Sequence, residues 1–478
     1  METQLVVLGG GPGGYAAAFL AADHGMDVTL VEAESRLGGT CLLRGCIPSK
    51  ALLHVARVIA EAEELSEAWG VDFGHPQIGL EKLRARKEQV ITTLSGGLAQ
   101  LAKRRKVKVI RARGSFRDSS TLQLAGDDPS IPPEKSITFQ HCILACGSVP
   151  AMPGAFQIGS DRVMDSTGAL QLDEIPETML VIGGGYIGLE MGTVYANLGS
   201  KVSVVELMDG LLMGADRDLV KPLHKRLEQL FEKRIYLNTK VGSVAQSSSG
   251  QIEVTFEGPG KFGTERFDRV LVSVGRRPNT AGIGLEHTRC QLDPRGFVRC
   301  DRQMRTDDPQ IFVIGDAAGE PMLAHKATHE GRLAVEVILG QPGAWDKRVI
   351  PAVVFTDPEI AWAGISEEQA KKEQIPHEVA VYPWAASGRA IAIGRTEGLT
   401  KFVIDPQSNR VLGCGIVGPG AGELIAEASL AIELGCEVGD ITETIHAHPT
   451  LSETLMNTGE VFFGTATEIY KPKREKSS

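Results

Sequence analysis

A strand, a glycine-rich turn, a helix and a second strand follow one another near the start of the chain, and this unit constrains the fold more than any other feature. The first strand is expected at residues 4–8, the turn begins at Gly9, and the second strand, at residues 28–31, ends at Glu32. The turn has the pattern G-x-G-x-x-G on Gly9, Gly11 and Gly14. Such glycines let the backbone approach a pyrophosphate at a helix N-terminus, and the acid accepts hydrogen bonds from a ribose. The unit therefore predicts a dinucleotide site on a Rossmann-like sheet.

The same unit recurs in the middle of the chain. Its strands are expected at residues 179–182 and 202–205, the second strand ends at Glu206, and the turn carries Gly183, Gly185 and Gly188. The number of residues from the first glycine to the acid is the same in both copies, so two dinucleotides are expected. The carboxylate of Glu206 would repel a 2′-phosphate, and no arginine occurs in the Leu-Met-Asp that follows it. We therefore expect the second dinucleotide to be NAD and not NADP.

Cys41 and Cys46 stand five positions apart, just before a helix expected to have Pro48 in its first turn. On a regular helix their Cα atoms would be roughly 8 to 9 Å apart, beyond the roughly 7 Å limit for a disulfide. The backbone between them must therefore bend if the pair is to be oxidised, and Gly45 permits this. At the positive end of the helix, Cys46 is expected to have a lowered thiol pKa. The spacing alone leaves two explanations open, a redox-active pair or two buried packing cysteines.

Residues 38–50 resemble the redox-active disulfide segment of the pyridine nucleotide–disulfide oxidoreductases, and Gly-Cys-Ile-Pro-Ser-Lys at residues 45–50 is the form found in dihydrolipoamide dehydrogenases. The resemblance extends from residue 4 to about residue 464, with departures at Leu43-Arg44 and at Cys146. It implies a flavoenzyme that oxidises protein-bound dihydrolipoamide through a Cys41–Cys46 disulfide and FAD and passes hydride to NAD⁺. Such an enzyme is the E3 component of 2-oxoacid dehydrogenase or glycine cleavage complexes.

A histidine and a glutamate near the C-terminus complete the catalytic set that the resemblance implies. In this family the histidine of the His-Pro pair, here His448, is the acid/base, and Glu453 orients it, both reaching the disulfide of the partner subunit. An imidazole suits the task because its pKa lies near neutrality. From the residues alone, Thr450-x-x-Glu453 also matches a helix capping box, and the two explanations are compatible. His446 matches no catalytic role and is expected to be structural.

The resemblance also implies the cofactor contacts. Lys50 is expected to pair with Glu190 beside the flavin, Asp316 to bind the ribityl chain of FAD, and Tyr186 to cover the nicotinamide pocket. From the residues alone, Lys50 and Glu190 are equally well explained as solvated helix charges. The expected FAD contacts are Gly9, Gly11, Gly14, Glu32, Gly39, Thr40, Lys50, Gly114, Gly147, Asp316 and Ala324. The expected NAD contacts are Gly183, Gly185, Tyr186, Gly188, Glu190, Glu206 and Gly275, and no metal ligand is expected.

The expected fold class is α/β, with two Rossmann-like dinucleotide-binding domains for FAD and NAD and a C-terminal α+β dimerisation domain. The expected boundaries are residues 1–150 with 281–348 for the FAD-binding domain, 151–280 for the NAD-binding domain and 349–478 for the interface domain. Cys142 and Cys146 are expected on one face of a strand, too far apart to bridge, and are interpreted as packing residues. The lysine-rich segment 469–478 carries no assignable role.

Composition and charge restrict the location and the partners. A net charge of −10 argues against nucleic acid as a main partner. Glycines and Pro12 interrupt the uncharged run at residues 4–22, so neither a membrane helix nor a signal sequence is expected. Eight cysteines in 478 residues form no secreted disulfide framework, and a cytoplasmic location is expected. The expected partners are a second copy of the chain, giving a homodimer, and lipoyl domains or the glycine cleavage H protein.

Four other functions fit the sequence less well. Glutathione reductase would need arginines where Glu206 stands, and mercuric reductase would need a second cysteine pair near the C-terminus, whereas the last cysteine is Cys436. A soluble transhydrogenase of this superfamily would typically lack the Cys41–Cys46 pair. A flavin-carrying regulatory subunit whose cysteines sense oxidants belongs to another class, because it would not consume NADH catalytically.

Overall fold

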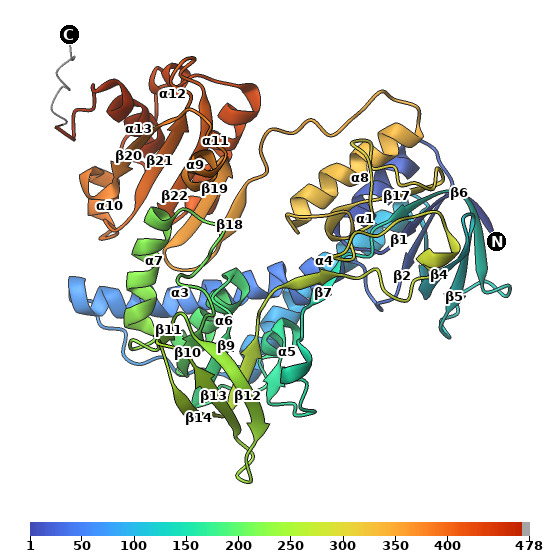
Figure 1. The fold of residues 1–478 in the computed structure, drawn as a ribbon, viewed down its shortest axis with the longest axis horizontal. Coiled ribbons are helices and arrows are strands. Elements are labelled where there is room, and N and C mark those ends of the chain that lie inside the picture. The colour runs from blue at the N-terminus through green and yellow to red at the C-terminus, as the bar shows by residue number, and fades with distance from the viewer. Residues whose placement is uncertain (471–478) are drawn as a thin grey trace.

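The computed structural model describes residues 1–470, and residues 471–478 of the lysine-rich C-terminal segment lie outside the described residues. Within the described part, the strands form three larger sheets, each accompanied by its own helices (Figure 1). In this view the first sheet lies at the right, the second at the bottom in green, and the C-terminal sheet at the upper left in orange and red. The expected α/β fold class with two nucleotide-binding units and a C-terminal α+β unit is confirmed.

The first sheet carries the first glycine turn and takes in one strand from far along the chain. Its strands are β1 (Glu2–Leu8), β2 (Val28–Glu32), β3 (Lys108–Arg111), β4 (Arg113–Asp118), β5 (Thr121–Ala125), β6 (Ser136–Leu144) and β17 (Ile311–Val313), in the order β3-β2-β1-β6-β5-β4 with β17 on β6. Strands β3, β2, β1, β6 and β17 run parallel. Helices α1 (Pro12–Asp23) and α8 (Ala324–Ile338) pack against each other beside them. The middle of β1 is a continuous apolar run, Leu5 to Val7, because such a strand is buried on both faces.

The second sheet repeats this arrangement around the second glycine turn. Its strands are β8 (Val163–Met164), β9 (Thr178–Ile182), β10 (Lys201–Val205), β11 (Ile235–Tyr236) and β15 (Arg269–Val272), all parallel, in the order β11-β10-β9-β15-β8. Helices α5 (Ser166–Gln171), α6 (Tyr186–Asn197) and α7 (Arg217–Leu230) belong to this part of the chain, and an antiparallel sheet of β12 (Lys240–Gln246), β13 (Ile252–Glu257) and β14 (Gly263–Phe267) packs beside it.

Two long helices and a small ribbon join these sheets. The helices are α3 (Cys46–Trp69) and α4 (Leu80–Arg104), and α3 packs against α6 of the second unit. The ribbon pairs β7 (Ser148–Pro150) with β16 (Arg276–Pro278), where the chain leaves the first sheet and returns to it. The two nucleotide-binding units therefore meet along α3 and this ribbon.

The C-terminal sheet is antiparallel, in the order β18-β19-β22-β21-β20. Its strands are β18 (Ala352–Val354), β19 (Glu359–Gly364), β20 (Glu378–Pro383), β21 (Leu399–Ile404) and β22 (Val411–Gly418), and its helices are α9 (Glu367–Lys372), α10 (Gly388–Ala392), α11 (Ala421–Leu434), α12 (Val438–Thr442) and α13 (Glu453–Phe463). Helix α7 of the second unit reaches up to this sheet (Figure 1). Nowhere in residues 1–470 is there a helix with the length and apolar character needed to cross a membrane.

Candidate active site

The two glycine turns have nearly the same geometry. Gly9 has φ +113° and Gly183 has φ +108°, which only glycine adopts without strain. The third glycine of each turn, Gly14 or Gly188, packs so closely on the first that a Cβ there would collide with its carbonyl oxygen. A side chain at the third glycine would therefore force the backbone of either turn out of its present conformation.

The acid at the end of the second strand closes each turn in the same way. Glu32 Oε2 accepts a hydrogen bond from Gly10 N at 2.7 Å, and Glu206 Oε2 accepts one from Gly184 N at 2.6 Å. Burial raises the pKa of the Glu32 carboxyl, and the N–H donors only partly offset this. Each carboxylate therefore fixes the backbone of its glycine turn when no ligand is bound.

The middle glycines face open space. Gly11 and Gly185 are the N-cap residues of α1 and α6, and no side chain caps either helix. A Cβ on Gly11 would meet nothing closer than Gly39 Cα at 3.8 Å, and a Cβ on Gly185 would meet nothing within 4 Å. Free N–H groups at a helix N-terminus with a clear approach fit a pyrophosphate, so both turns fit a dinucleotide.

A cavity of about 880 Å³ opens in front of the first turn. Most of the expected FAD contacts line it, together with Tyr186 and Glu190 from the second unit. Gly114 is not among the lining residues, because it lies in β4 against Leu8, and its neighbour Arg113 faces the cavity instead. The expected residues that line the cavity are Gly9, Gly11, Gly14, Glu32, Gly39, Thr40, Cys41, Cys46, Lys50, Gly147, Asp316 and Ala324.

The remaining expected NAD contacts lie outside this cavity. Gly183, Gly185, Gly188 and Glu206 surround the second turn, and Gly275, at φ +119°, lies between β15 and β16. Tyr186 and Glu190, on the first two turns of α6, connect the second glycine turn with the cavity. The geometry therefore suits two dinucleotides whose reactive ends meet near Tyr186.

The cysteine pair lies in the cavity wall where one helix ends and the next begins. Helix α2 (Gly39–Arg44) carries Cys41 and stops at Gly45, whose φ of −148° and ψ of −113° interrupt the helix, and Cys46 is the first residue of α3. A Cβ on Gly45 would lie 2.8 Å from Thr40 O, so the bend expected at this glycine is confirmed. The two thiols lie close enough for each to shift the pKa of the other.

The two sulfurs are electrostatically different. The hydrogen bond from Cys41, aided by the nearby Lys50 ammonium, lowers the pKa of Cys46 to about 7. The same hydrogen bond and burial raise the pKa of Cys41 above its usual range. In the reduced pair, Cys46 is therefore the thiolate and Cys41 the thiol that donates to it.

Lys50 and Glu190 form an ion pair behind the cysteines. Lys50 Nζ lies 2.9 Å from Glu190 Oε2 and 3.1 Å from Oε1, and only 4% of the Glu190 side chain is exposed. Glu190 also accepts from Phe355 N at 3.0 Å, and the Lys50 ammonium lies 4.4 Å from the centroid of the Phe355 ring. Because Glu190 is buried and paired with Lys50, these two residues are not solvated charges on the surfaces of their helices.

Two residues that the sequence did not single out, Ser148 and Arg276, also shape the cavity. Ser148 donates a hydrogen bond to Asp316, and Arg276 Nε donates to Ser148 Oγ at 2.8 Å. The expected place of Cys146 on the strand with Cys142 was wrong, because β6 ends at Leu144. Cys146 does pack against the core of the first unit, and it also lines the cavity. Burial raises the pKa of the Cys146 thiol to about 12. The sequence did hold one sign that Cys146 and Ser148 line the cavity, because they are the neighbours of Gly147, an expected FAD contact.

His448 and Glu453 are paired far along the chain from the cavity. His448 Nδ1 lies 2.9 Å from Glu453 Oε1, and 78% of the His448 side chain is exposed. The other oxygen, Oε2, accepts from Thr450 N at 2.7 Å. The expected capping box is half formed: the bond from Thr450 N to the Glu453 carboxylate is present, but α13 begins at Glu453 itself with Ser452 as N-cap and no side-chain cap. Glu453 therefore contacts the imidazole with one oxygen and the loop backbone with the other.

Within the described residues, the lining of the cavity ends at Ala327, so His448 does not share the cavity of its own chain with Cys41. His446, two residues earlier, is largely buried and is held by Glu427 Oε1 at 2.6 Å and by Thr444 O at 2.8 Å. The expected structural role of His446 fits these contacts.

Comparison with known proteins identifies the family. The model of the pyridine nucleotide-disulphide oxidoreductases matches residues 3–331, and that of the dimerisation domain of the same family matches residues 350–458. The chain belongs to the pyridine nucleotide-disulphide oxidoreductases.

Several members of this family are similar to the chain over nearly its full length. Dihydrolipoyl dehydrogenase of Vibrio cholerae is 48% identical, covering 100% of this chain and 99% of that protein. The enzyme of the same name from Geobacillus stearothermophilus is 43% identical, covering 98% of each. Among solved structures, LpdA from Mycobacterium tuberculosis has a TM-score of 0.87 at 27% identity, covering 96% of this chain and 99% of that one. The HOCl-induced flavoprotein disulfide reductase RclA from Escherichia coli has a TM-score of 0.84 at 26% identity, covering 96% of this chain and 99% of that one.

Proposed function

We propose that the chain is an NAD-dependent flavoenzyme that oxidises dihydrolipoamide to lipoamide, as the name of its relatives states. The observation that carries the proposal is the cysteine pair in the wall of a cavity bounded by a glycine turn and by the Lys50–Glu190 pair. The cavity fits FAD in volume and in its open helix N-terminus at Gly11. The bound flavin would supply a two-electron carrier between the dithiol and NAD⁺.

The residues of the chain perform the thiol chemistry. His448 removes a proton from one substrate thiol, and the resulting thiolate attacks Cys41 Sγ of the Cys41–Cys46 disulfide. The protein disulfide breaks, Cys46 leaves as a thiolate, and a mixed disulfide joins Cys41 to the substrate. The second substrate thiol passes its proton to Cys41 as it displaces that sulfur, which becomes a thiol, and the substrate leaves as cyclic lipoamide. The substrate has then lost two electrons and the cysteine pair has gained them. The lowered pKa of Cys46 makes it the better leaving group in the first step.

We further propose that the active unit is a homodimer in which each His448–Glu453 pair serves the cysteines of the other copy. The match of residues 350–458 to a dimerisation domain supports this, as does the exposure of His448 outside its own cavity. The proposed domains are residues 1–150 with 281–348 for FAD, 151–280 for NAD and 349–478 for dimerisation. The proposed partners are lipoyl domains of 2-oxoacid dehydrogenase complexes or the glycine cleavage H protein, in the cytoplasm.

An anaerobic assay distinguishes this function from the others. Purified FAD-loaded protein is mixed with NAD⁺ and either dihydrolipoamide or reduced glutathione, and NADH formation is followed. We expect catalytic NADH formation with dihydrolipoamide alone. Turnover with glutathione would indicate a glutathione reductase-like enzyme, and a single equivalent of electron transfer would indicate a redox sensor.

The first prediction concerns cofactor choice. Because Glu206 would face a 2′-phosphate, we expect the rate of lipoamide reduction with NADH to exceed that with NADPH by roughly 100-fold or more at equal concentration. Glu206→Gln removes the charge, and we expect it to narrow this ratio. Steady-state rates with both nucleotides measure it, and an equal rate for the two in the wild type would contradict the assignment.

The second prediction concerns the pH dependence of the reduced pair. Since the pKa of Cys46 is lowered to about 7, we expect one thiolate to be absent below this pH and present above it. Its ultraviolet thiolate absorbance, taken as the difference between the reduced wild type and Cys46→Ser, is measured across the pH range. Lys50→Met should move the midpoint upward, because the ammonium favours the thiolate. A wild-type midpoint at or above the usual thiol range would disprove the asymmetry.

A further inference from the structure

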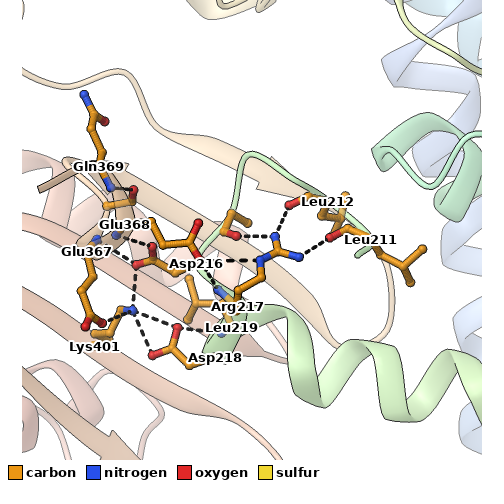
Figure 2. A network of polar contacts seen from close by, with 12 residues as sticks. Leu211, Leu212, Asp216, Arg217, Asp218, Leu219, Glu367, Glu368, Gln369 and Lys401 are labelled. Atoms are coloured by element: carbon orange, nitrogen blue, oxygen red, sulfur yellow. Dashed lines mark hydrogen bonds and ion pairs between the residues drawn. The ribbon is translucent and has the colours of Figure 1, made fainter. Parts of the chain in front are cut away.

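A buried lysine joins the C-terminal sheet to the second nucleotide-binding unit. Lys401 lies in β21, and 1% of its side chain is exposed. Its ammonium contacts Asp216 Oδ2 at 2.7 Å, Asp218 Oδ1 at 2.8 Å and Glu367 Oε2 at 3.1 Å (Figure 2). An ammonium has three N–H donors, so each of them has a carboxylate partner. Asp216 and Asp218 belong to the start of α7, whereas Glu367 begins α9.

Asp216 is the centre of this network. Its carboxylate also accepts hydrogen bonds from the backbone N–H groups of Glu367 at 3.0 Å and Glu368 at 3.1 Å, and it therefore holds the start of α9 as well as Lys401. Burial raises the pKa of Asp216, but the hydrogen bonds from Lys401 and Glu368 N outweigh it and the pKa is lowered. Asp216 is thus charged at neutral pH.

The next residue carries the connection into the loop between β10 and α7. Arg217 donates through Nη1 to Leu211 O at 2.7 Å and through Nη2 to Leu212 O and Ala215 O (Figure 2). Three carbonyl groups of the loop are therefore fixed by one guanidinium adjacent to Asp216. A displacement of Asp216 would move this guanidinium and the loop that it holds.

The loop in turn supports the second glycine turn. Leu212 N donates to Gly184 O at 3.0 Å, and a Cβ on Gly184 would lie 2.6 Å from Leu211 Cδ2. Gly184 is the residue whose N–H binds Glu206. A continuous series of contacts therefore connects Lys401, through Asp216, Arg217 and the loop, to the turn and acid proposed to bind NAD.

We infer that Lys401 is a positioning residue for pyridine nucleotide binding, acting from the C-terminal sheet on the second glycine turn. This inference rests on the proposed NAD site. Removal of the ammonium leaves three carboxylates facing one another, two of them at the start of α7, with only the exposed Lys371 ammonium still bound to Glu367. Their repulsion is relieved by displacement of Asp216, and the loop follows. Nucleotide affinity then falls, while the cysteine chemistry in the cavity in front of the first glycine turn is unaffected.

The test is a titration of FAD-loaded protein with ADP-ribose, which occupies the glycine turn without any redox step. For Lys401→Met we expect the dissociation constant to rise roughly 5- to 150-fold, the range typical of coupling between sites. In steady-state assays the KM for NAD⁺ should rise while kcat changes by less than about twofold, because binding is lost and chemistry is not. Visible flavin absorbance reports whether the variant has folded.

Two further variants make the result decisive. Lys371→Met removes an exposed ammonium that binds Glu367 from the solvent side, and we expect its dissociation constant to stay within about twofold of wild type. Asp218→Asn removes a partner that is 40% exposed and should raise the constant by about two- to fivefold, which decides the case if Lys401→Met does not fold. If the folded Lys401 or Asp218 variants bind ADP-ribose as tightly as the wild type does, this inference is overturned but the proposed function is not. A wild type that binds no ADP-ribose overturns the proposed function and this inference with it.

Discussion

Cys41→Ser is expected to abolish dihydrolipoamide oxidation while leaving a flavin that NADH can still reduce. Serine cannot form the disulfide that the substrate thiolate attacks, so lipoamide-dependent turnover should fall by at least about 1,000-fold, as it does when other catalytic nucleophiles are removed. In the proposed function, NADH binds at the second glycine turn and reaches the flavin past Tyr186, so that step would not need this sulfur. Steady-state lipoamide assays measure the reaction that needs the disulfide, and anaerobic bleaching of the flavin by NADH measures flavin reduction separately.

Cys146→Ser is the matched control for that experiment. Cys146 lines the same cavity, but the pKa of its thiol is raised to about 12, so it is neutral and unsuited to thiol exchange at working pH. We expect this variant to keep most of its turnover. Retained lipoamide activity in Cys41→Ser would remove Cys41 from the mechanism, whatever the control shows.

His448→Gln is expected to lower dihydrolipoamide oxidation by about 100- to 10,000-fold, the usual contribution of a general base, with FAD still bound. The glutamine amide can donate to Glu453 Oε1 in place of the imidazole but cannot remove a thiol proton. The defect should shrink as pH rises, because substrate thiols then ionise without help. A pH profile of kcat/KM for wild type and variant provides the measurement.

His446→Gln is the matched control for the histidine. His446 is two residues away and also pairs with a carboxylate, Glu427, but only 5% of its side chain is exposed, so a substrate cannot reach it. Per correctly folded, FAD-loaded molecule, we expect nearly full activity. The reverse pattern, with His448→Gln active and His446→Gln inactive, would transfer the role of base to His446.

Local patterns in the sequence were sufficient for most of the fold. The two units could be predicted because each motif, from the first glycine to the acid, lies within about thirty consecutive residues. In the structure the ends of each motif meet, through the hydrogen bonds from Gly10 N to Glu32 and from Gly184 N to Glu206. The first two strands of the first sheet, β1 and β2, followed from short apolar runs on either side of the glycine turn and its helix.

The proposed catalytic residues could be named for another reason, since Cys41, Cys46, His448 and Glu453 lie in short motifs that resemble those of the family. The capping box at Thr450 is only half formed, because the Glu453 carboxylate binds Thr450 N but α13 begins at Glu453 with Ser452 as its N-cap. Cys146 was misplaced because β6 ends at Leu144, before the apolar run does, and the next residues line the cavity.

The Lys401 network could not have been found from the sequence. Its members come from three segments that the fold brings together, α7, α9 and β21, and none of them lies in a recognisable motif (Figure 2). The one local sign was a lysine within an otherwise apolar strand. A charge buried there needs partners from elsewhere in the fold.

The most direct test of the central claim maps the thiols of the protein through one catalytic cycle. The oxidised, FAD-loaded enzyme is treated anaerobically with one equivalent of dihydrolipoamide, alkylated under denaturing conditions and analysed by peptide mass spectrometry, and a second sample receives excess NAD⁺ before alkylation. We predict that Cys41 and Cys46 become alkylated in the first sample and are protected again in the second, while the other cysteines do not change. Unchanged labelling of Cys41 and Cys46 in both samples, together with normal NADH formation, would contradict the claim.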